Sequence, residues 1–453
     1  MIRHTGFLII LVLCCWQSPG VAVAADPAKA PVPLSLEPGD RLVLLGGTFA
    51  ERMGQFGYFE TLLASRRARL RLTLRSLAWP ADEVTRREWQ FALIRYMGGR
   101  KGWADGGEVL LQPRPRDFGN VYSHLKQQKP TVLLMCFGFN ESFQGKAGLV
   151  KFGVDLARFV GEMKRPLATG REAGKATGPR IVLVSPIAQE RIGRFGPDPR
   201  SRNSQLKMYT GKIRSVAAAS GVSFVDLFTA TQRLVTAAES PRLTFNGVHL
   251  TGFGNWIVAQ LMADGLGLVA RPWRVSIDGR SAKATATATT VADVGVAADR
   301  VVFVTGDAVL PVPPPSSDGS PRKLTPVLAE PLPRLTVSGL ATGRWTLLIN
   351  GQVSAKATAD EWARGVRLTR GGSLAAAEEL RSAVIEKNRQ FFFRWRAVNG
   401  EYNYGRRKNP FGTKSFPSEM KKLDRMVRDR DEKIWYLARP RPAMQFELKR
   451  DVS

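Results

Sequence analysis

From Leu42 to Leu266 the chain alternates short apolar runs with longer amphipathic stretches, and this alternation restricts the folds open to it. Continuous apolar runs are typical of strands buried on both faces of a parallel sheet. The expected strands are Leu42–Leu45, Leu70–Leu74, Thr131–Phe137, Ile181–Val184 and Val222–Leu227. The expected helices are Tyr58–Arg67, Phe118–Gln128, Leu149–Met163, Asn203–Ala219 and Phe253–Leu266. The pattern predicts a doubly wound α/β domain with a five-stranded parallel sheet, whose ligands lie beyond the carboxyl ends of the strands.

Beyond Arg271 the pattern changes to short β-branched or alternating segments separated by Gly, Pro and Asp. These segments are Trp273–Asp278, Arg300–Thr305, Arg334–Ser338 and Trp345–Ile349, with a Pro/Ser-rich linker or loop at Pro311–Pro321. They predict a smaller β-rich module, for which a sandwich is one arrangement. Two helices are expected after it, on stripes formed by Ala377, Leu380, Val384, Phe391 and Trp395 and by Met420, Leu423, Val427 and Ile434. The expected division is a signal peptide over 1–25, the α/β domain over 33–270, the β-rich module over 271–368 and a helical region over 369–453.

The first residues resemble a secretory signal. Arg3 precedes the apolar run Phe7–Trp16, and Ala22–Ala25 offers small residues for cleavage. No later stretch is long enough to span a bilayer, and an uncleaved anchor is the alternative. Export to the periplasm or medium is therefore expected. Cleavage would leave Cys136 as the lone cysteine, so that no internal disulfide could form.

The charge balance points to anionic partners. The chain has 67 basic and 39 acidic residues, a formal net charge of +28. Such a surface attracts polysaccharide, phospholipid head groups or nucleic acid. No nucleic-acid-binding module accompanies it, so nucleic acid is not an expected partner. A basic surface without a dedicated partner is the alternative.

Histidine narrows the search for a catalytic base, because the chain has only three. His4 lies in the signal segment, and His124 lies in a helical stretch where a solvated position is expected. His249 lies in the Gly-containing loop Phe245–Thr251, directly before the last helix of the α/β domain. His249 is therefore the candidate general base, with a structural loop histidine as the alternative. Two histidines and one cysteine in an apolar run do not form a metal-ligand cluster, and no metal or other cofactor is expected.

Two strand ends carry polar groups that could act with this histidine. After the first strand, Gly46-Gly47-Thr48 places a hydroxyl at a strand-to-helix turn, where helix amides are close by. After the third strand, Gly138-Phe139-Asn140 places a side-chain amide that could donate to an oxyanion. Each motif is also ordinary turn or capping chemistry. Their order along the chain, hydroxyl then Asn then His, is the more informative feature.

This order resembles the SGNH/GDSL hydrolase superfamily over roughly residues 36 to 268. The Gly-Asp-Ser block corresponds to Gly46-Gly47-Thr48, and the block that lends a glycine amide corresponds to Arg75–Asp82, with Ala81 at the glycine position. Gly-x-Asn-Asp corresponds to Gly138–Glu141, and Asp-x-x-His to Asn246–His249. The resemblance implies a Thr48 nucleophile and a His249 base. It also implies an oxyanion hole formed by the Thr48 and Ala81 amides and the Asn140 side chain.

Four of the departures from the family pattern affect the predicted site. The methyl group of Thr48 crowds a nucleophile that is otherwise Ser, and Ala81 narrows the pocket at a glycine position. Asn246 stands where a carboxylate would orient the imidazole, and Gly47 removes the Asp of the first block. The sequence resembles a bacterial subgroup in which Gly-x-Thr accompanies Asn-Glu-Ser and Asn-Gly-x-His. The departures thus look like one altered site.

Other side chains could contribute. Ser142 and Ser185 lie near strand ends at the same rim, as alternative hydroxyls. Glu141 and Glu190 could supply a carboxylate to His249 or to a water molecule. In the C-terminal aromatic and basic stretch, Phe391 and Trp395 are expected in the core. Tyr402, Tyr404 and Arg406 are candidates for a sugar-binding surface beside the active-site rim.

These features lead to an exported ester hydrolase that acts on acylated carbohydrate as the first hypothesis. The second hypothesis is a catalytically impaired SGNH-fold protein that binds an acidic glycan or another envelope ligand in the same cleft. The third is a structural envelope protein whose β-rich module carries the function.

Overall fold

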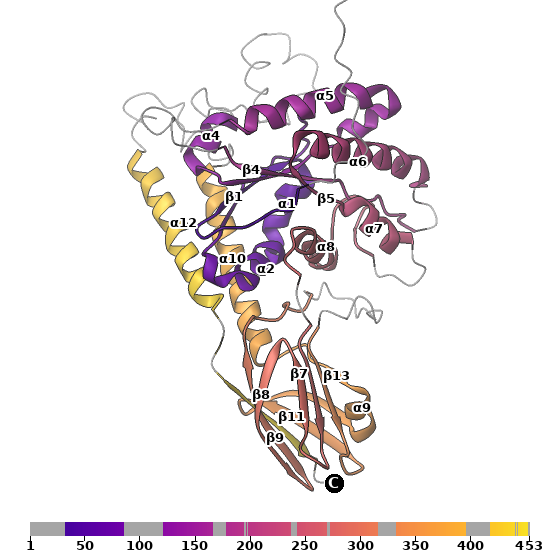
Figure 1. Ribbon diagram of the computed structural model, residues 1–453, viewed down its shortest axis with the longest axis vertical. Coiled ribbons are helices and arrows are strands. Elements are labelled where there is room, and N and C mark those ends of the chain that lie inside the picture. Colours follow the sequence, from indigo (N-terminus) through magenta and orange to yellow (C-terminus); the bar gives the residue numbers. More distant parts are fainter. Residues whose placement is uncertain are drawn as a thin grey trace, which may run out of the picture.

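The computed structural model describes residues 32–85, 121–165, 178–193, 196, 198–236, 242–269, 272–315, 332–395, 417–439, 441 and 443–451. An α/β domain lies at one end of the long axis and a β module at the other, with helix α10 reaching from one to the other (Figure 1). The expected segments 1–25 and 316–321, and the residues Tyr402, Tyr404 and Arg406, lie outside the described residues.

The α/β domain contains the expected five-stranded parallel sheet, in the order β2-β1-β3-β4-β5. Its strands are β1 (Arg41–Gly46), β2 (Thr73–Ser76), β3 (Val132–Cys136), β4 (Arg180–Val184) and β5 (Ser223–Val225). Two differ from the expectation. The run Leu70–Leu74 becomes a strand only from Thr73, because Ala68–Leu70 forms a 3-10 turn that ends at Arg71 in the left-handed region. The last strand stops at Val225, because the Asp226 carboxylate caps the next helix.

Helices cover both faces of this sheet. They are α1 (Thr48–Phe56), α2 (Tyr58–Arg66), α4 (Val121–Gln128), α5 (Gly145–Met163), α6 (Arg200–Ser220), α7 (Leu227–Thr236) and α8 (Gly252–Gly265). Leu42 and Leu44 of β1 pack with α1, α2 and α8, whereas Val43 and Leu45 pack with α4, α5 and α6. Helix α1 follows the strand-to-helix turn that was expected at Thr48, although its extent was not predicted, and α7 was not expected from the sequence.

Two C-terminal helices, α10 (Ser373–Trp395) and α12 (Pro417–Leu437), pack beside β2 at the edge of the sheet. The expected apolar stripe of α10 is buried throughout, including Phe391 and Trp395. The free edge of β2 is covered by side chains from these helices. Trp435 donates its indole N–H to the carbonyl of Leu72 at 2.8 Å, and the Lys387 ammonium donates to the carbonyl of Leu74 at 2.7 Å. Backbone carbonyls at this open edge of the sheet are thereby hydrogen-bonded within the chain.

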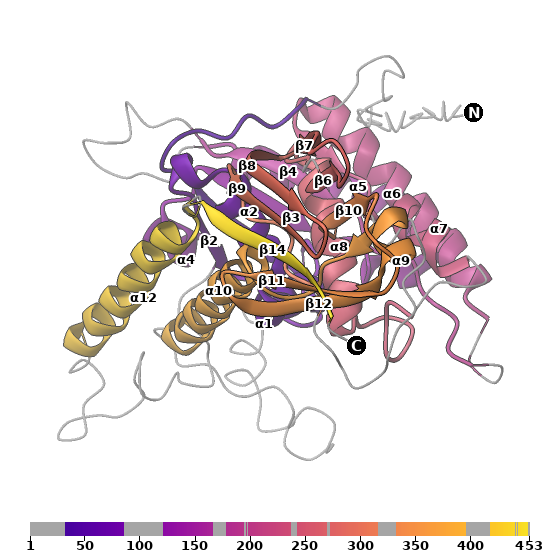
Figure 2. The same cartoon turned by 90° about the horizontal axis from the view of Figure 1, so that it is seen from below.

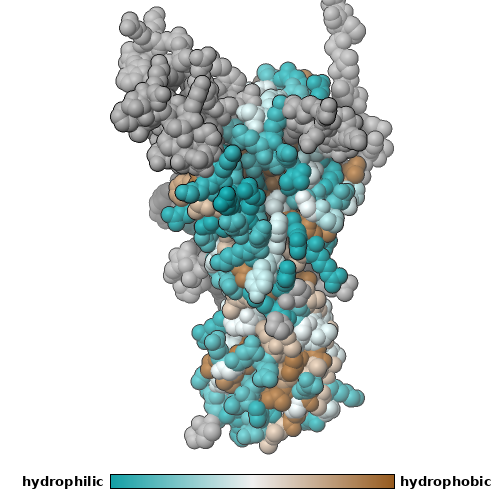
Figure 3. Space-filling model, turned by 90° about the vertical axis from the view of Figure 1, so that its left-hand side faces the viewer, coloured by the Kyte–Doolittle hydropathy of each residue, from teal (hydrophilic) through white to brown (hydrophobic). Residues whose placement is uncertain are grey.

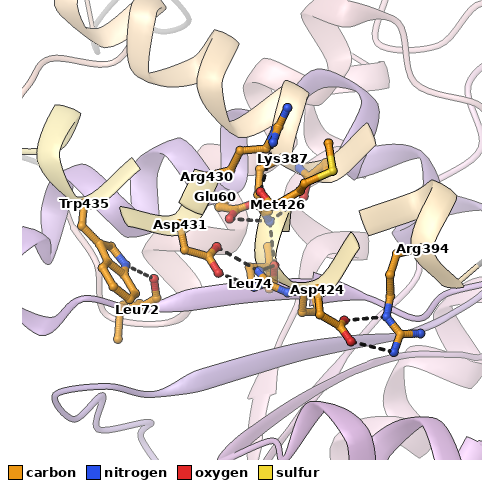
Figure 4. Close-up of polar contacts among 12 residues, drawn as sticks. Glu60, Leu72, Leu74, Lys387, Arg394, Asp424, Met426, Arg430, Asp431 and Trp435 are labelled. Atoms are coloured by element: carbon orange, nitrogen blue, oxygen red, sulfur yellow. Dashed lines mark hydrogen bonds and ion pairs between the residues drawn. The ribbon is translucent and has the colours of Figure 1, made fainter. Parts of the chain in front are cut away.

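A buried ion pair fastens α10 to the α/β domain (Figure 4). Lys387 is 0% exposed, and its Nζ lies 2.7 Å from the carboxylate of Glu60 on α2. Burial raises the pKa of Glu60 and lowers that of Lys387, while each charge opposes the shift of the other. Close by, Arg75 of β2 forms an ion pair with Asp431 of α12. The C-terminal helices are therefore held against the sheet by polar contacts as well as by packing.

The β module is a sandwich of two sheets (Figure 2). One sheet has the order β13-β10-β6-β7, and its strands are β6 (Arg274–Asp278), β7 (Ala284–Thr287), β10 (Arg334–Ser338) and β13 (Val366–Arg367). The other has the order β12-β11-β14-β9-β8, and its strands are β8 (Thr289–Ala297), β9 (Arg300–Asp307), β11 (Arg344–Ile349), β12 (Gln352–Thr358) and β14 (Met444–Arg450). Helix α9 (Ala359–Arg364) follows β12. Both sheets contribute to one apolar core, which includes Val337, Phe303 and Phe446.

The end of the chain corrects the expectation of a helical region over 369–453. Met444–Arg450 forms β14, which pairs with β9 and β11 in the middle of the sheet. The alternation of Met444, Phe446 and Leu448 toward the core is the physical reason. The chain thus returns from the α/β domain to complete the β module.

The side of the molecule on which α12 lies is mostly hydrophilic over the α/β domain and more mixed over the β module (Figure 3). Exposed charged residues of α12, such as Lys422 and Arg425, contribute to the hydrophilic surface. Within the described ranges, no helix has both the length and the apolar character needed to cross a bilayer.

Removal of one member of the buried pair should destabilise the protein. Lys387→Met leaves the Glu60 carboxyl buried without its partner, and we expect the free energy of unfolding to fall by about 3–5 kcal/mol. Lys387→Met combined with Glu60→Leu should recover most of the loss. Chemical denaturation measures both. The control is Arg430→Gln, which removes the partially exposed pair with Glu386 and should cost less than about 1 kcal/mol. An equal cost for the two single variants would contradict this account.

Candidate functional site

A pocket of about 260 Å³ lies beyond the carboxyl ends of β1, β3 and β4. Its lining includes Thr48, Ala81, Asn140 and His249, which come from four separate segments of the chain. This is the rim at which ligands bind in doubly wound folds. The structure therefore brings together the principal residues that the sequence singled out, while their catalytic roles stay predictions.

Thr48 owes its position to a sharp turn after β1. Gly46 has a φ of +139°, and a Cβ there would lie 2.2 Å from the carbonyl oxygen of Cys136 on β3, so only glycine fits. Gly47 precedes α1 in extended geometry, and Thr48 is the first helical residue. The backbone N–H groups of the first turn have no partner within a helix. The Thr48 hydroxyl accepts a hydrogen bond from the Ala81 N–H at 3.4 Å.

Ala81 is brought to Thr48 by the segment that follows β2. The amides of Leu77 and Trp79 donate to the carbonyls of Leu44 and Gly46, each at 2.9 Å, so the segment follows β1 to its end. The chain then turns over Trp79–Asp82, closed by a 3.1 Å bond from the Asp82 N–H to the Trp79 carbonyl. Ala81 occupies the third position with a φ of +62°, which suits the glycine of a type II turn. The substitution thus keeps the amide donor and adds backbone strain.

Asn140 faces Ala81 from the loop after β3. Its side-chain Nδ2 donates to the carbonyl of Asp82 at 3.3 Å. This bond and the bond from Ala81 to Thr48 are both longer than ordinary hydrogen bonds of their kind. Both donors are therefore weakly engaged, and an oxyanion in the pocket would compete effectively with their present acceptors.

His249 reaches the pocket from the loop before α8. Its ring stacks on Phe245, with centroids 5.7 Å apart. Burial, and next the positive charge of Arg52, lower the pKa of His249 from its ordinary value. The imidazole is therefore neutral at pH 7, as a general base must be.

Asn246 contacts the Nδ1 atom of His249 in a way that an aspartate could not. The Asn246 Oδ1 accepts the backbone N–H groups of Val248 and His249, at 3.2 and 2.9 Å, so the oxygen is held on that side. Its Nδ2 lies 2.8 Å from His249 Nδ1, and its Oδ1 lies 3.1 Å from the same atom. Donation from Nδ2 puts the ring hydrogen on Nε2, whereas the Oδ1 contact puts it on Nδ1 and leaves Nε2 free as a base. The two contacts correspond to the two neutral tautomers of the ring, and Asn246 can support either one.

Glu190, expected as a partner of His249 or of a water, holds the histidine loop by its backbone instead. Its carboxylate accepts the N–H groups of Leu243 and Thr244 at 3.3 and 2.8 Å, and the Thr244 hydroxyl as well. Thr244 in turn accepts the N–H of Gly247. Glu190 therefore influences His249 indirectly, by holding the loop that carries it.

Glu141 links the loop after β3, which carries Asn140, to the segment after β2, which carries Ala81. Its carboxylate accepts the N–H of Val84 at 2.9 Å and the N–H of Gly138 at 2.8 Å. Burial raises the pKa of Glu141 to about 7, against the opposing effect of these backbone donors. The described contacts of the carboxylate go to backbone amides and not to His249.

The alternative hydroxyls are engaged elsewhere. Ser142 is 0% exposed, and its hydroxyl donates to the carbonyl of Phe139 at 2.6 Å, so it does not face the pocket. Ser185 lines the pocket, but its Oγ accepts the N–H groups of Leu227 and Phe228 at the start of α7. Cys136 also lines the pocket, and burial raises the pKa of its thiol to about 12. None of these three groups is therefore placed to replace the Thr48 hydroxyl.

His124 corrects a further expectation. It is 1% exposed rather than solvated, and its ring meets the edge of Trp395 at a centroid distance of 5.8 Å. The physical reason is α10, which the sequence could not place beside α4. Within the described ranges, no group of three or more His, Cys, Asp or Glu side chains is arranged to hold a metal ion.

The sequence did not single out Arg52, which also lines the pocket. It stands four residues after Thr48, on the same side of α1. Continuing the helix expected after Thr48 by one turn would have placed Arg52 beside it.

Comparison with known proteins yields structural similarity alone. No protein-family model matches the chain, and no curated protein matches it in sequence. A gut microbial diltiazem-metabolizing enzyme is 18% identical with a TM-score of 0.64, over 93% of this chain and 100% of that one. A GDSL-like lipase from Parabacteroides merdae is 16% identical with a TM-score of 0.37, over 52% of this chain and 100% of that one. A variant of an acetylxylan esterase from Geobacillus stearothermophilus is 18% identical with a TM-score of 0.36, at the same coverage.

The first of these similarities extends over both the α/β domain and the β module. The expected doubly wound α/β fold with a five-stranded parallel sheet is confirmed. At this level of identity the likeness establishes the fold, and activity has to be argued from the pocket.

The left-handed backbone conformation of Ala81 leads to a testable prediction. Ala81→Gly should raise the free energy of unfolding by about 1 kcal/mol, because glycine adopts the left-handed conformation without the Cβ penalty. Chemical denaturation measures the change. The matched control is Ala157→Gly on the exposed side of α5, which should lower stability by a similar amount. Loss of stability in both variants would contradict the strained turn.

Proposed function

We propose that this protein is an exported ester hydrolase in which Thr48 is the nucleophile and His249 the general base. The observation that supports the proposal most is the convergence of Thr48, Ala81, Asn140 and His249 on one pocket. The loosely engaged donors of Ala81 and Asn140 add to it, since a hydrolase needs them free for an oxyanion.

The chemistry follows the acyl-transfer scheme. The Thr48 Oγ1 attacks the ester carbonyl carbon while its proton passes to His249 Nε2. The tetrahedral oxyanion accepts hydrogen bonds from the Thr48 and Ala81 amides and from Asn140. The carbon–oxygen bond to the alcohol breaks as His249 protonates the leaving group. A water molecule, deprotonated by His249, then attacks the acyl-Thr48 ester and releases the acid and the free hydroxyl.

Hydrogen bonds from the oxyanion donors should account for much of the rate enhancement. Loss of one such donor typically costs 10²–10³ in kcat in enzymes of this kind. The base contributes less while the ring is held as the Nε2–H tautomer, because Nε2 must then lose its hydrogen before it can accept one. We therefore propose a slow enzyme that Asn246 limits.

The similar structure is that of a diltiazem-metabolizing enzyme, and this description supports proposing catalysis on the same scaffold. An acylated carbohydrate as the substrate stays a prediction from the sequence. So does export, because the segment 1–25 lies outside the described residues.

One observation favours a second function, a binding protein that holds an anionic glycan in the same pocket. The 2.8 Å contact from Asn246 Nδ2 to His249 Nδ1 disables the base wherever Nδ2 is the donor, because the ring hydrogen then lies on Nε2. Absence of turnover, together with retained ligand binding, would favour this second function.

The nucleophile and base are tested on p-nitrophenyl acetate. The purified protein should hydrolyse it above the buffer rate, and Thr48→Ala or His249→Ala should each reduce turnover to background. Ser142→Ala is the matched control, since that buried hydroxyl lies outside the pocket lining, and it should retain the wild-type rate. Thr48→Ser should be faster than the wild type, because the γ-methyl group no longer crowds the attack. Equal activity in Thr48→Ala and the wild type would overturn the proposed nucleophile.

Asn246→Asp tests the tautomer. A carboxylate can accept from His249 Nδ1 but cannot donate to it, so Nε2 becomes the free base and kcat/KM should rise by roughly 10²–10⁴-fold. The carboxylate also raises the pKa of His249. Because the neutral ring is the active form, the acid limb of the pH–rate profile should then move to higher pH. An unchanged rate with an unchanged profile would show that Asn246 does not limit the reaction.

A further inference from the structure

Arg52 shares a wall of the pocket with the Thr48 hydroxyl. The two residues stand at the first and fifth positions of α1. Residues four apart on a helix face the same side, separated by about 6 Å along the axis. A ligand whose ester carbonyl lies at Thr48 therefore passes Arg52 one helical turn further along.

The guanidinium of Arg52 is held in place without a counter-charge. Its Cζ lies 5.4 Å from the centroid of the Phe245 ring, which in turn stacks on His249. Its Nε is buried and has no hydrogen-bond partner among the described residues. No ion pair to Arg52 occurs in that part of the chain either. Other arginines with a buried, unpaired Nε, such as Arg202 and Arg334, donate from their terminal nitrogens to protein carbonyls. Arg52 has no such bond among the described residues, and its guanidinium is therefore open to a ligand.

We infer that Arg52 binds a carboxylate of the substrate, so that the preferred ester is anionic. The inference rests on the proposed hydrolysis, and it names the substrate class of that same pocket. A planar guanidinium donates to a carboxylate in a two-pronged geometry, and its charge strengthens both bonds. The cation–π contact with Phe245 restricts the side chain of Arg52 and so lowers the entropy lost on binding.

The net charge of the whole chain also favours anionic ligands. A net charge of +28 raises the local concentration of anionic ligands around the molecule, although it does not by itself select a site. Arg52 supplies the selection, because its guanidinium lies in the pocket lining beside Thr48 and His249, whereas the carboxylate of the described lining, Asp82, comes from the segment after β2.

A pair of nearly isosteric esters tests the inference. 4-Acetoxybenzoate carries a carboxylate at neutral pH, and 4-acetoxybenzamide carries a neutral amide of similar size. The wild-type protein should hydrolyse the anionic ester with the higher kcat/KM. Arg52→Gln should reduce the ratio of the two kcat/KM values about 10- to 100-fold, mainly through a higher KM for the anionic ester. Arg52→Lys, which keeps the charge and loses the planar donors, should give an intermediate ratio.

The control for a general loss of positive charge is Arg425→Gln, on the exposed side of α12. It should keep the wild-type ratio. A ratio that Arg52→Gln leaves unchanged, or that Arg425→Gln lowers equally, would overturn the inference.

Failure of the inference can be separated from failure of the proposed hydrolysis. If the wild-type protein hydrolyses neither ester, the hydrolase proposal fails, and titration calorimetry with the intact 4-acetoxybenzoate then tests Arg52 by itself. Tighter binding than for 4-acetoxybenzamide, lost in Arg52→Gln, would support the anion site without catalysis. Equal binding of the two compounds to the wild-type protein would overturn it.

Discussion

The candidate site depends on the parallel register of β1 with its two neighbours. Gly46 pairs with Cys136 of β3 so closely that no side chain fits between them, and the segment after β2 follows β1 to its end. Because the three strands run in the same direction, the loops that follow them open at one rim. Thr48, Ala81 and Asn140 are neighbours for this reason. A slip of one residue in either pairing would move an oxyanion donor away from the hydroxyl.

Buried carboxylates hold the loops that the sheet brings together. Glu141 joins the loop after β3 to the segment after β2, and Glu190 fixes the loop that carries His249. Further out, the pair between Lys387 and Glu60 fastens the C-terminal helices to the edge of the sheet (Figure 4). Charged groups thus serve as supports at three levels, whereas the groups that face the pocket are mostly neutral. Arg52 and Asp82 are the charged residues of the described lining, and we propose that the charge of Arg52 serves a ligand.

Much of the fold could be predicted from the sequence, because a buried parallel strand and an amphipathic helix leave strong periodic signals. The order hydroxyl, Asn and His also located the rim. The strand-to-helix turn at Thr48 was expected, but the extent of α1 was not, since its apolar pattern is short, and Arg52 was missed for that reason. Contacts between distant segments leave no local signal. The burial of His124 under Trp395, the return of β14 to the sandwich and the backbone contacts of Glu190 therefore needed coordinates.

The central claim is that the Thr48 hydroxyl forms a covalent acyl intermediate in this pocket. Its most direct test is labelling with a fluorophosphonate, which reacts with an activated hydroxyl beside oxyanion donors, followed by mass spectrometry of the peptides. The account predicts one adduct on Thr48, absent from Thr48→Ala and slower to form in His249→Ala. An adduct on another residue, or hydrolytic turnover that continues without any adduct on Thr48, would contradict it.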